Sequence, residues 1–464
     1  MRTFTLRVKN PLPTWGILAF LVLVTLMTHY LLVPVGFEFL DGDFSPDVLV
    51  ANEIRQGKWS AFYFGLPYGG VVFTFIRALW VAGWEAFSSD VNSHVTSQMT
   101  FTFLVCPALM AVGSYFLVRA YCSRFAAFWV GLLMAVNFQF LIMQCGNDVY
   151  TGFLLLGFGL LTWRASLRNP LMDLGPLLLF VASALSGLAL FSSRATAYYV
   201  LAFFLPWDWF YGEVKRLCRP RGWTERLLFY GGCIFMLLFL YLEAFGPDMG
   251  EIFGKRVRVH AQPNFNYGLY LFLILELKIR WRQLWRRPIL NRFLIVGAGV
   301  FMGFSPELVH FLRLGQSPPP PMADGMKFED MMSTVGSIPK SLQEFFAAGP
   351  GIGENASLLI VLLGFYFLFR RSRKDQQVQP LLLVAILSVF AYCRYHTYVF
   401  ATPRYLMPIL PAALVSMGCF WDEMRRRGAG YLAVAVLLFS FHVAHHWNAR
   451  VHYVDAVHAM PRKG

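Results

Sequence analysis

Charged side chains are scarce in this sequence. Asp, Glu, Lys and Arg together make up 14% of the 464 residues, whereas hydrophobic residues make up 57% and recur in long runs from end to end. A soluble protein could not enclose so many apolar runs in one core. The composition therefore excludes a soluble enzyme and predicts an all-α polytopic transmembrane protein.

Acidic residues are fewer than basic ones, and the formal net charge is +14. Such a balance can indicate nucleic-acid binding, which requires the basic side chains on one soluble face. Here they stand in short clusters between apolar runs, as membrane topology predicts. We therefore exclude nucleic acid as a partner and expect the lipid bilayer instead.

The seven cysteines include no CxxC pair, and most lie in or beside apolar runs. This excludes a disulfide framework or a zinc site and favours small buried side chains. No other His, Cys or Asp spacing indicates a metal site, so a divalent cation would need carboxylates from separate loops. The sequence also contains no tandem repeat or separate soluble domain, which predicts one membrane domain over residues 1–464.

Four histidines lie in the last apolar run and the tail: His442, His445, His446 and His452. His442 and His446 share a helical face, with His445 beside them, so a metal site is one interpretation. Histidines at the membrane interface are the favoured one.

The first apolar run, 14–35, carries no formal charge and is too long for a signal peptide, which predicts an uncleaved signal anchor. Arg2, Arg7 and Lys9 precede it and place the N-terminus in the cytoplasm. Twelve later runs predict spans centred on about 97–118, 125–143, 149–163, 174–191, 195–211, 226–243, 264–277, 293–311, 356–369, 378–398, 405–420 and 429–445.

One further run, 66–84, is interrupted by Arg77. If it crossed the bilayer, all the basic clusters after it would face outward; if it lay along the membrane surface, they would all face the cytoplasm. These clusters lie at 119–124, 164–168, 215–226, 278–292, 370–374 and 425–427. The positive-inside bias favours the surface location and about thirteen spans. Residues 36–96 then form a long first external loop with interfacial helices, and 313–355 form a second large external loop.

An acidic cluster, Asp41, Asp43 and Asp47, follows the first span. Carboxylates just past a membrane helix are costly to desolvate, which makes the cluster a candidate site. The alternative is a solvated loop that marks the end of the helix.

After Asp43 the sequence continues with IRQG at 54–57 and FYFGLPYGG at 62–70. This order resembles the GT-C superfamily of membrane glycosyltransferases, in particular bacterial family-39-like proteins and dolichyl-phosphate-mannose protein mannosyltransferases. Their first external loop has an acidic residue, an amphipathic helix ending I-x-x-G, an aromatic stretch and G-x-P-Y-x-G. Asp43 matches the catalytic aspartate of the family. The Glu that usually follows is Phe44 here, which leaves open whether Asp47 supplies the second carboxylate.

Three other stretches resemble the family in the same order. GLALFSS at 187–193 is similar to G-L-x-x-W-x-S, with Phe191 in place of Trp. GFSPE at 303–307 is similar to G-x-S-P-E, and RYLMP at 404–408 is similar to R-Y-L-x-P at the start of a late span.

The resemblance implies a GT-C-like fold and inverting transfer of a sugar from a polyprenyl-phosphate donor. The acceptor would be a lipid, glycan or protein at the external face of a bacterial inner membrane. Such transfer needs a base for the acceptor and positive charge on the departing phosphate. We expect Asp43 to be the base, with Asp47 or Asp41 as its orienting partner.

Four further residues are candidate substrate-binding groups: Asp148, Arg404, Arg194 and His260. Asp148 is alternatively a helix N-cap, because it precedes an apolar run. Arg404 begins a span at headgroup depth and offers bidentate contacts to phosphate, although snorkelling to lipid headgroups is the other interpretation. Members of the superfamily differ in their use of a divalent cation, so the sequence names no certain cofactor.

A second class of function is a non-catalytic lipid-linked-sugar transporter or polysaccharide export component. A transporter should place charges at mid-membrane in broken, paired repeats. Here the spans are largely free of charge and the acids gather at one outer edge, which favours the transferase.

Overall fold

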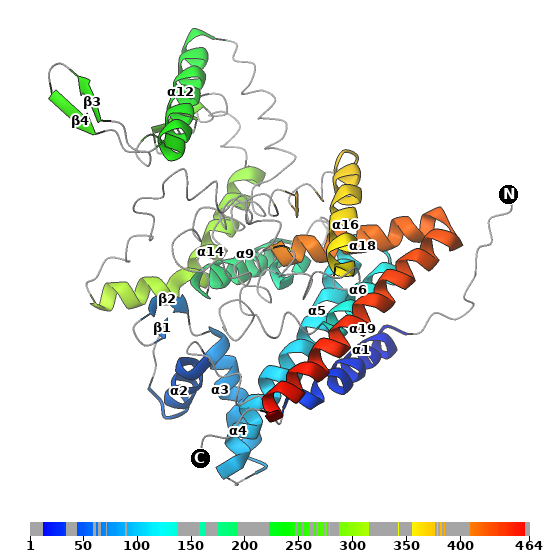
Figure 1. The fold of residues 1–464 in the computed structure, drawn as a ribbon. Helices are drawn as coiled ribbons and strands as arrows, with labels where there is room; N and C mark the ends of the chain where they lie inside the picture. The colour runs from blue at the N-terminus through cyan, green and yellow to red at the C-terminus, as the bar shows by residue number, and fades with distance from the viewer. Residues whose placement is uncertain are drawn as a thin grey trace.

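The structure is a computed structural model. It describes residues 13–33, 44–58, 62–63, 66–70, 72–88, 91–137, 157–162, 175–192, 222–245, 249–252, 255–258, 287–314, 355–375 and 409–459, with isolated pieces at 264–278, at 342 and at 378–385. Most of these residues are helical (Figure 1). The predicted helical fold is therefore confirmed, and two short β-hairpins are additional to it.

Six helices form a bundle that contains the main apolar core (Figure 1). They are α1 (Thr14–His29), α5 (Cys106–Tyr121), α6 (Arg124–Val136), α16 (Ala356–Ser372), α18 (Leu410–Arg427) and α19 (Ala429–Ala459). α18 is central, because every residue from 410 to 421 is buried. The Trp421 ring stacks on Trp129 of α6 with centroids 4.6 Å apart, which fixes these two helices side by side.

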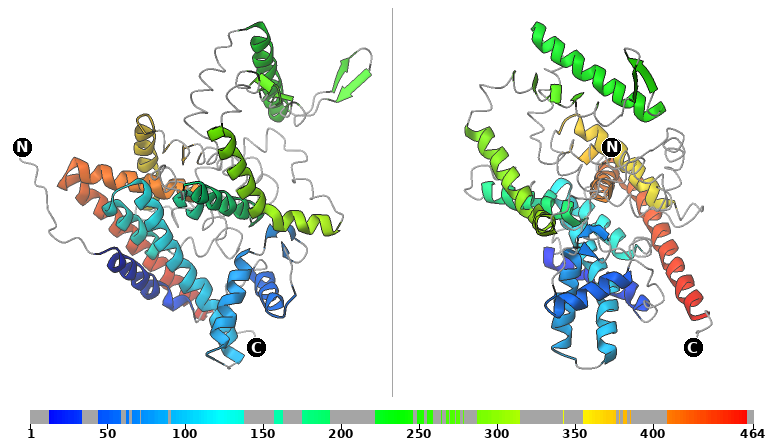
Figure 2. Two further views of the ribbon diagram at one scale, coloured as in Figure 1. Left: turned by 180° about the vertical axis from the view of Figure 1, so that it is seen from behind. Right: turned by 90° about the vertical axis from the view of Figure 1, so that its left-hand side faces the viewer.

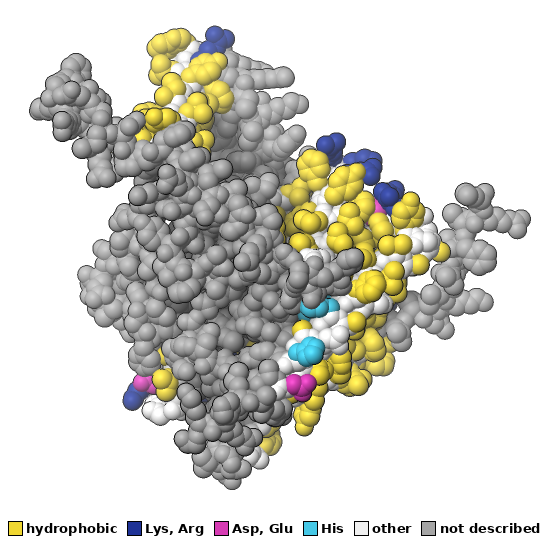
Figure 3. Space-filling view, viewed as in Figure 1, with side chains coloured by type: hydrophobic (Ala, Val, Ile, Leu, Met, Phe, Trp, Pro, Cys, Tyr) yellow, Lys and Arg dark blue, Asp and Glu magenta, His cyan; other side chains and the backbone are white. Residues whose placement is uncertain are grey.

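Four helical stretches among the described residues are long and apolar enough to cross a membrane. They are Thr14–Leu32, Thr96–Tyr121, Trp223–Leu242 and Ala429–His452. On α19 an outward stripe of Tyr431, Val434, Leu437 and Phe441 is exposed, as expected of side chains that face lipid. Figure 3 shows this apolar surface between Lys and Arg at one end and His and acidic residues at the other. The prediction of a membrane protein is confirmed, and the number of spans stays a prediction.

Three of the six basic clusters meet at one end of the bundle, which we call the basic end. They lie at the turn between α5 and α6, at the end of α16 and at the end of α18. The Ser123 N–H donates to Asp422 at 3.0 Å, and Arg371 Nη1 lies 3.9 Å from Cys122 Sγ. Segments about 250 to 300 residues apart therefore lie at one end of the bundle, in agreement with the predicted topology for these three clusters.

α9 (Gly175–Ser192) and α14 (Arg287–Leu314) pack closely against each other and coincide with two predicted spans. The contact is made by glycines. A Cβ at Gly187 would overlap the Val300 carbonyl oxygen, and a Cβ at Gly303 would overlap that of Ala184. Small residues of this kind let helix backbones approach in a membrane. Both glycines begin stretches that resemble the glycosyltransferase family, so the structure gives these glycines a packing role.

One helix and the hairpin after it lie apart from the bundle in Figures 1 and 2. α12 (Trp223–Phe245) is a long apolar helix, and the hairpin of β3 (Met249–Ile252) and β4 (Lys255–Arg258) follows it. The hairpin is antiparallel and places Glu251 opposite Arg256.

We predict that Gly303→Val destabilises the protein, because its side chain would collide with the backbone of α9. The expected loss is about 1–3 kcal/mol or more, as for other overpacked contacts. Gly297→Val is the matched control on the same helix, since a Cβ there meets nothing within 4 Å. Thermal denaturation of the purified protein in lipid nanodiscs measures both, and equal denaturation temperatures for the two variants would contradict this packing.

Candidate functional site

The segment between the first two spans of the bundle folds into a compact unit, which we call the first-loop unit. It contains α2 (Phe44–Arg55), β1 (Phe62–Tyr63), β2 (Leu66–Gly70), α3 (Val72–Glu85) and α4 (Val91–Thr100). Both views in Figure 2 show it, in blue, at the same end of the bundle as the end of α19. This is the segment that carries the predicted acids.

α2 packs on α3 through a small apolar core. Val50, Ala51 and Ile54, at helical spacing, are buried together with Ala78 of α3. Arg55 in the last turn of α2 forms an ion pair with Glu85 at the end of α3. Gly57 then adopts a φ of 79°, a conformation that glycine adopts without strain, which ends the helix. The I-x-x-G pattern in the sequence thus corresponds to a helix C-terminus.

α3 in turn is held on α4 and on the π-helical turn η3 (Phe101–Val105). Arg77 is 1% exposed, donates to Gln98 at 3.3 Å and lies 5.5 Å from the centroid of the Phe101 ring. Trp80 Nε1 donates to the Ser97 carbonyl at 3.1 Å. Because η3 continues directly into α5, the first-loop unit is fixed to the start of a membrane helix.

The length of α3 bears on whether 66–84 crosses the membrane. The first five residues of that run form β2, which leaves a helix of 14 residues. At 1.5 Å per residue, such a helix is about 21 Å long, shorter than the ~30 Å hydrocarbon core. This favours a location at the membrane surface, and the external side of the loop stays a prediction.

Most predicted site residues lie outside the described residues: Asp41, Asp43, Asp148, Arg194, His260 and Arg404. The second large external loop, 313–355, also lies outside them except at 313–314, 342 and 355. Asp47 is in the first turn of α2, and Asp43 is the residue before that helix begins. The roles of all these residues therefore stay predictions.

A group of polar side chains, which we call the polar cluster, is buried inside the bundle. It lies towards the end of α19, at the end of the bundle where the first-loop unit also lies. Its members on α19 are His442, His446 and Arg450, each 1% exposed, and they continue the buried face of Ala435 and Phe439. The His442 and His446 rings lie 4.2 Å apart, centroid to centroid. The interpretation of these two histidines as interfacial is wrong, because they face the neighbouring helices rather than lipid headgroups.

Side chains of the cluster on α19 form hydrogen bonds with α16 and α6. His442 shares a hydrogen bond with Ser357 at the start of α16 through Nδ1. Its Nε2 lies 3.4 Å from the Leu133 carbonyl of α6, which can only accept, so this nitrogen carries the proton. Arg450 Nη2 donates to the Val136 carbonyl at 3.2 Å, next to the C-terminus of α6.

α1 contributes His29, which is fully buried, and Thr28, whose hydroxyl donates to the Ala135 carbonyl at 3.0 Å. The polar cluster therefore joins α1, α6, α16 and α19. Sequence reasoning did not single out His29 or Arg450. The sequence did contain a signal for Arg450. Ala435, Phe439, His442, His446 and Arg450 follow one another at intervals of three or four residues, which places Arg450 on the same inward face of α19.

The described residues contain no group of three His, Cys, Asp or Glu side chains that could hold a metal ion. The polar cluster is thus organised by hydrogen bonds and ring contacts between helices. Its hydrogen bonds give partners to the Leu133, Ala135 and Val136 carbonyls at the end of α6, which would be costly to leave unpaired in a membrane.

No protein-family model matches this sequence, and no curated protein sequence matches it. Among solved structures, an oligosaccharyltransferase from Archaeoglobus fulgidus, in complex with zinc and sulfate, superposes with a TM-score of 0.49 and 14% identity. The alignment covers 93% of this chain and 53% of that one. The apo form gives a TM-score of 0.48 and 14% identity, over 97% and 56% of the two chains.

The archaeal oligosaccharyltransferase AglB from the same organism, in complex with an inhibitory peptide and a dolichol-phosphate, gives a TM-score of 0.45 and 13% identity. The alignment covers 93% of this chain and 56% of AglB. The chain thus spans about half the length of these proteins. Such values are too low to assign a family, a reaction or site residues to this chain.

We predict that Phe87→Cys, just after α3, is labelled from outside the cell by an impermeant thiol reagent in a cysteine-free background. Phe87 is 95% exposed, so the label can reach it. Arg373→Cys, at the basic end, should be labelled only after permeabilisation. The reverse pattern at both positions would contradict the predicted topology, in which 66–84 lies at the membrane surface.

We also predict that His442→Ala destabilises the bundle by about 2–5 kcal/mol, as for other large-to-small changes in a core. The change removes buried ring contacts and leaves the Ser357 hydroxyl without this partner. His452→Ala is the matched control, because His452 is exposed on the same helix. Denaturation midpoints measured in nanodiscs compare the two, and a midpoint for His442→Ala equal to that of His452→Ala would refute the structural role.

Proposed function

We propose that this protein is an inverting membrane glycosyltransferase of the GT-C type. It would transfer a sugar from a polyprenyl-phosphate donor to a lipid, glycan or protein acceptor at the external face of the membrane. The observation that carries the proposal is the first-loop unit. It joins the acidic segment 41–47 to α2, which the Arg55–Glu85 ion pair and an apolar core fix on α3.

A fixed base is what the reaction needs. General-base catalysis requires a carboxylate within hydrogen-bond reach of the acceptor, and positioning accounts for much of the rate of such steps. A loop that ends in a packed helix limits the positions open to Asp43. A free loop of the same sequence would lose this advantage.

The proposed step conserves atoms and charge. Asp43 accepts the proton of the acceptor O–H or N–H as that atom forms a bond to the anomeric carbon. The bond between this carbon and the phosphate oxygen breaks on the opposite face, which inverts the configuration. Arg404 meets the negative charge on the departing lipid phosphate with its planar guanidinium.

The other candidates would have supporting roles. Asp47 orients Asp43 or supplies the second carboxylate that Phe44 does not, whereas Asp148, Arg194 and His260 bind donor or acceptor. No step of the proposal passes through a metal ion.

Replacement of Asp43 by Asn tests the base directly. Asn caps a helix as well as Asp does, so the start of α2 should be preserved while the proton acceptor is lost. The rate of sugar transfer from a synthetic polyprenyl-phosphate donor by the purified protein should fall by about 10²–10⁴-fold. Asp47→Asn should cost less if Asp47 only orients its neighbour, and as much if it is the second carboxylate.

Asp455→Asn is the control, because Asp455 is an exposed acid on the last helix, far along the sequence from the first loop. Its rate should equal that of the parent protein. Full activity in Asp43→Asn would remove the base from this segment and with it the catalytic proposal.

A further inference from the structure

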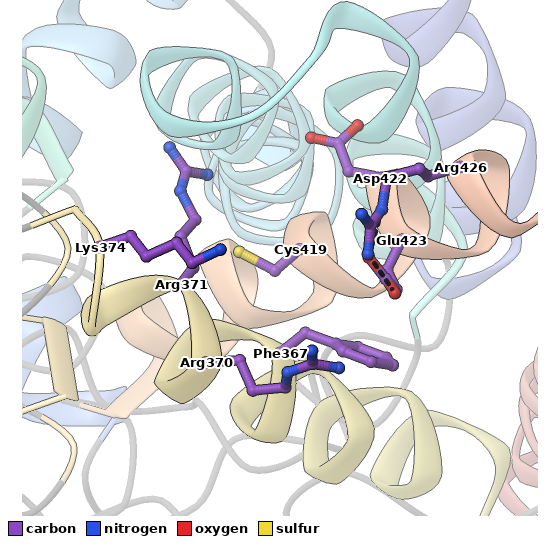
Figure 4. A pocket seen from close by; sticks show the side chains of 8 residues that line it. All are labelled: Phe367, Arg370, Arg371, Lys374, Cys419, Asp422, Glu423 and Arg426. Carbon is purple, nitrogen blue, oxygen red and sulfur yellow. Dashed lines mark hydrogen bonds and ion pairs between the residues drawn. The ribbon is translucent and has the colours of Figure 1, made fainter.

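A pocket of about 330 Å³ lies at the basic end, between the last turns of α16 and α18. Figure 4 shows residues of α16 on one side of it and residues of α18 on the other. It is lined by Phe367, Arg370, Arg371, Lys374, Cys419, Asp422, Glu423 and Arg426. None of these residues takes part in the proposed transfer reaction, which is placed at the opposite end of the bundle.

Both acids of the pocket are already engaged. Glu423 accepts from Arg426 Nε at 2.9 Å and Nη2 at 2.8 Å, and from Arg427 Nε at 2.9 Å. Although burial acts in the opposite direction, these hydrogen bonds lower the pKa of Glu423, which keeps it ionised. Asp422 accepts from the backbone N–H and the hydroxyl of Ser123, at the N-terminus of α6.

Two of the cations have no carboxylate partner among the described residues. Arg370 and Lys374 lie four residues apart and are both exposed, whereas Arg371 pairs with Asp375 at 3.1 Å. The spacing places Arg370 and Lys374 on the same side of the end of α16. A ligand in the pocket would therefore meet two positive side chains that no described acid neutralises.

The negative ends of the helix dipoles offset only part of the positive charge in the pocket. Four cations and two carboxylates line the pocket, which leaves a formal excess of two positive charges. Each helix C-terminus carries about half a negative charge, so the ends of α16 and α18 together offset only about one. The remaining charge favours an anion.

An apolar surface leads away from the pocket along α16. Leu359, Leu362, Tyr366 and Phe369 are each between 42% and 55% exposed and follow the outward face of that helix. Tyr366 lies beneath Arg370, with the guanidinium 5.9 Å from its ring centroid, as is typical of the membrane interface. A molecule with a charged head and apolar chains would match both surfaces.

We propose that this pocket binds the phosphate headgroup of an anionic phospholipid, with Arg370 and Lys374 on the phosphate and the acyl chains along α16. Basic pockets between membrane helices are known to bind such headgroups. The site is independent of the proposed transferase activity, because it uses other residues at the other end of the bundle.

The full-length protein in detergent allows the test, with dihexanoyl phosphatidylglycerol as the probe and dihexanoyl phosphatidylcholine for comparison. Binding is measured by titration of the thermal shift. Each basic residue near an anionic surface contributes a change of about fivefold in affinity, so R370Q/K374Q should bind phosphatidylglycerol about 25-fold more weakly. Phosphatidylcholine should bind weakly to both proteins.

R373Q/R425Q is the matched control. It removes the same charge from the basic end, but Arg373 lies over the Phe369 ring at 4.8 Å and Arg425 over the Phe125 ring at 5.0 Å. Neither residue lines the pocket, and the affinity should change less than twofold. If R370Q/K374Q fails to fold, K374Q alone gives the same test with a loss of about fivefold.

Three results would overturn the proposal. Equal losses in R370Q/K374Q and R373Q/R425Q would assign the effect to general surface charge. Equal binding of phosphatidylcholine and phosphatidylglycerol would exclude recognition of the headgroup charge. Inorganic phosphate that binds as tightly as phosphatidylglycerol and competes with it would identify a site for the free anion rather than for a lipid.

Discussion

The close contact between α16 and α18 is the constraint on which both ends of the bundle depend. A Cβ at Gly364 of α16 would overlap the Ser416 carbonyl of α18, so the two backbones touch where neither residue has a large side chain. In lipid, helices gain little from hiding apolar surface from one another, and such close packing supplies the attraction. This contact brings the ends of α16 and α18 together around the basic pocket. It also holds the start of α16, with Ser357, against the inward face of α19.

Polar side chains have different environments at the two ends of the bundle. At the basic end several cations are exposed and lie over aromatic rings, as with Arg373 on Phe369 and Arg427 on Phe367. At the other end His442, His446 and Arg450 are buried and contact carbonyls or neighbouring rings. A long cationic side chain can reach headgroups and water when it is at a membrane surface. A polar group inside the bundle has no such outlet and needs a partner from another helix.

The first-loop unit connects these membrane helices with the proposed reaction. Its helices α2, α3 and α4 are only 10 to 14 residues long, and contacts of α3 with Phe101 hold the unit on η3. Arg77 illustrates the connection, because a single buried guanidinium contacts both Gln98 of α4 and the Phe101 ring. The acidic segment that precedes α2 is thereby attached to the start of α5. This attachment is what a site at the edge of a membrane requires for a fixed geometry.

The sequence by itself determined the membrane character, the helical fold and the apolar runs that became α1, α5, α9, α14 and α19, because these follow from local hydrophobicity. It also determined which segments carry the basic clusters, since charge is read directly from composition. Only the tertiary structure decided which face of each helix has a partner. The histidines of α19 show this, because their periodicity places them on one face but does not tell lipid from protein beyond it.

The glycines at 187 and 303 show the same limit, because their contact joins helices more than 100 residues apart. The pocket between Lys374 and Arg426 also depends on residues from two distant segments. The catalytic assignment of Asp43 rests on sequence resemblance, as that residue lies outside the described part of the chain. Local hydrophobicity and charge thus set where the helices form, whereas the close fit of small residues between helices decided which polar groups meet.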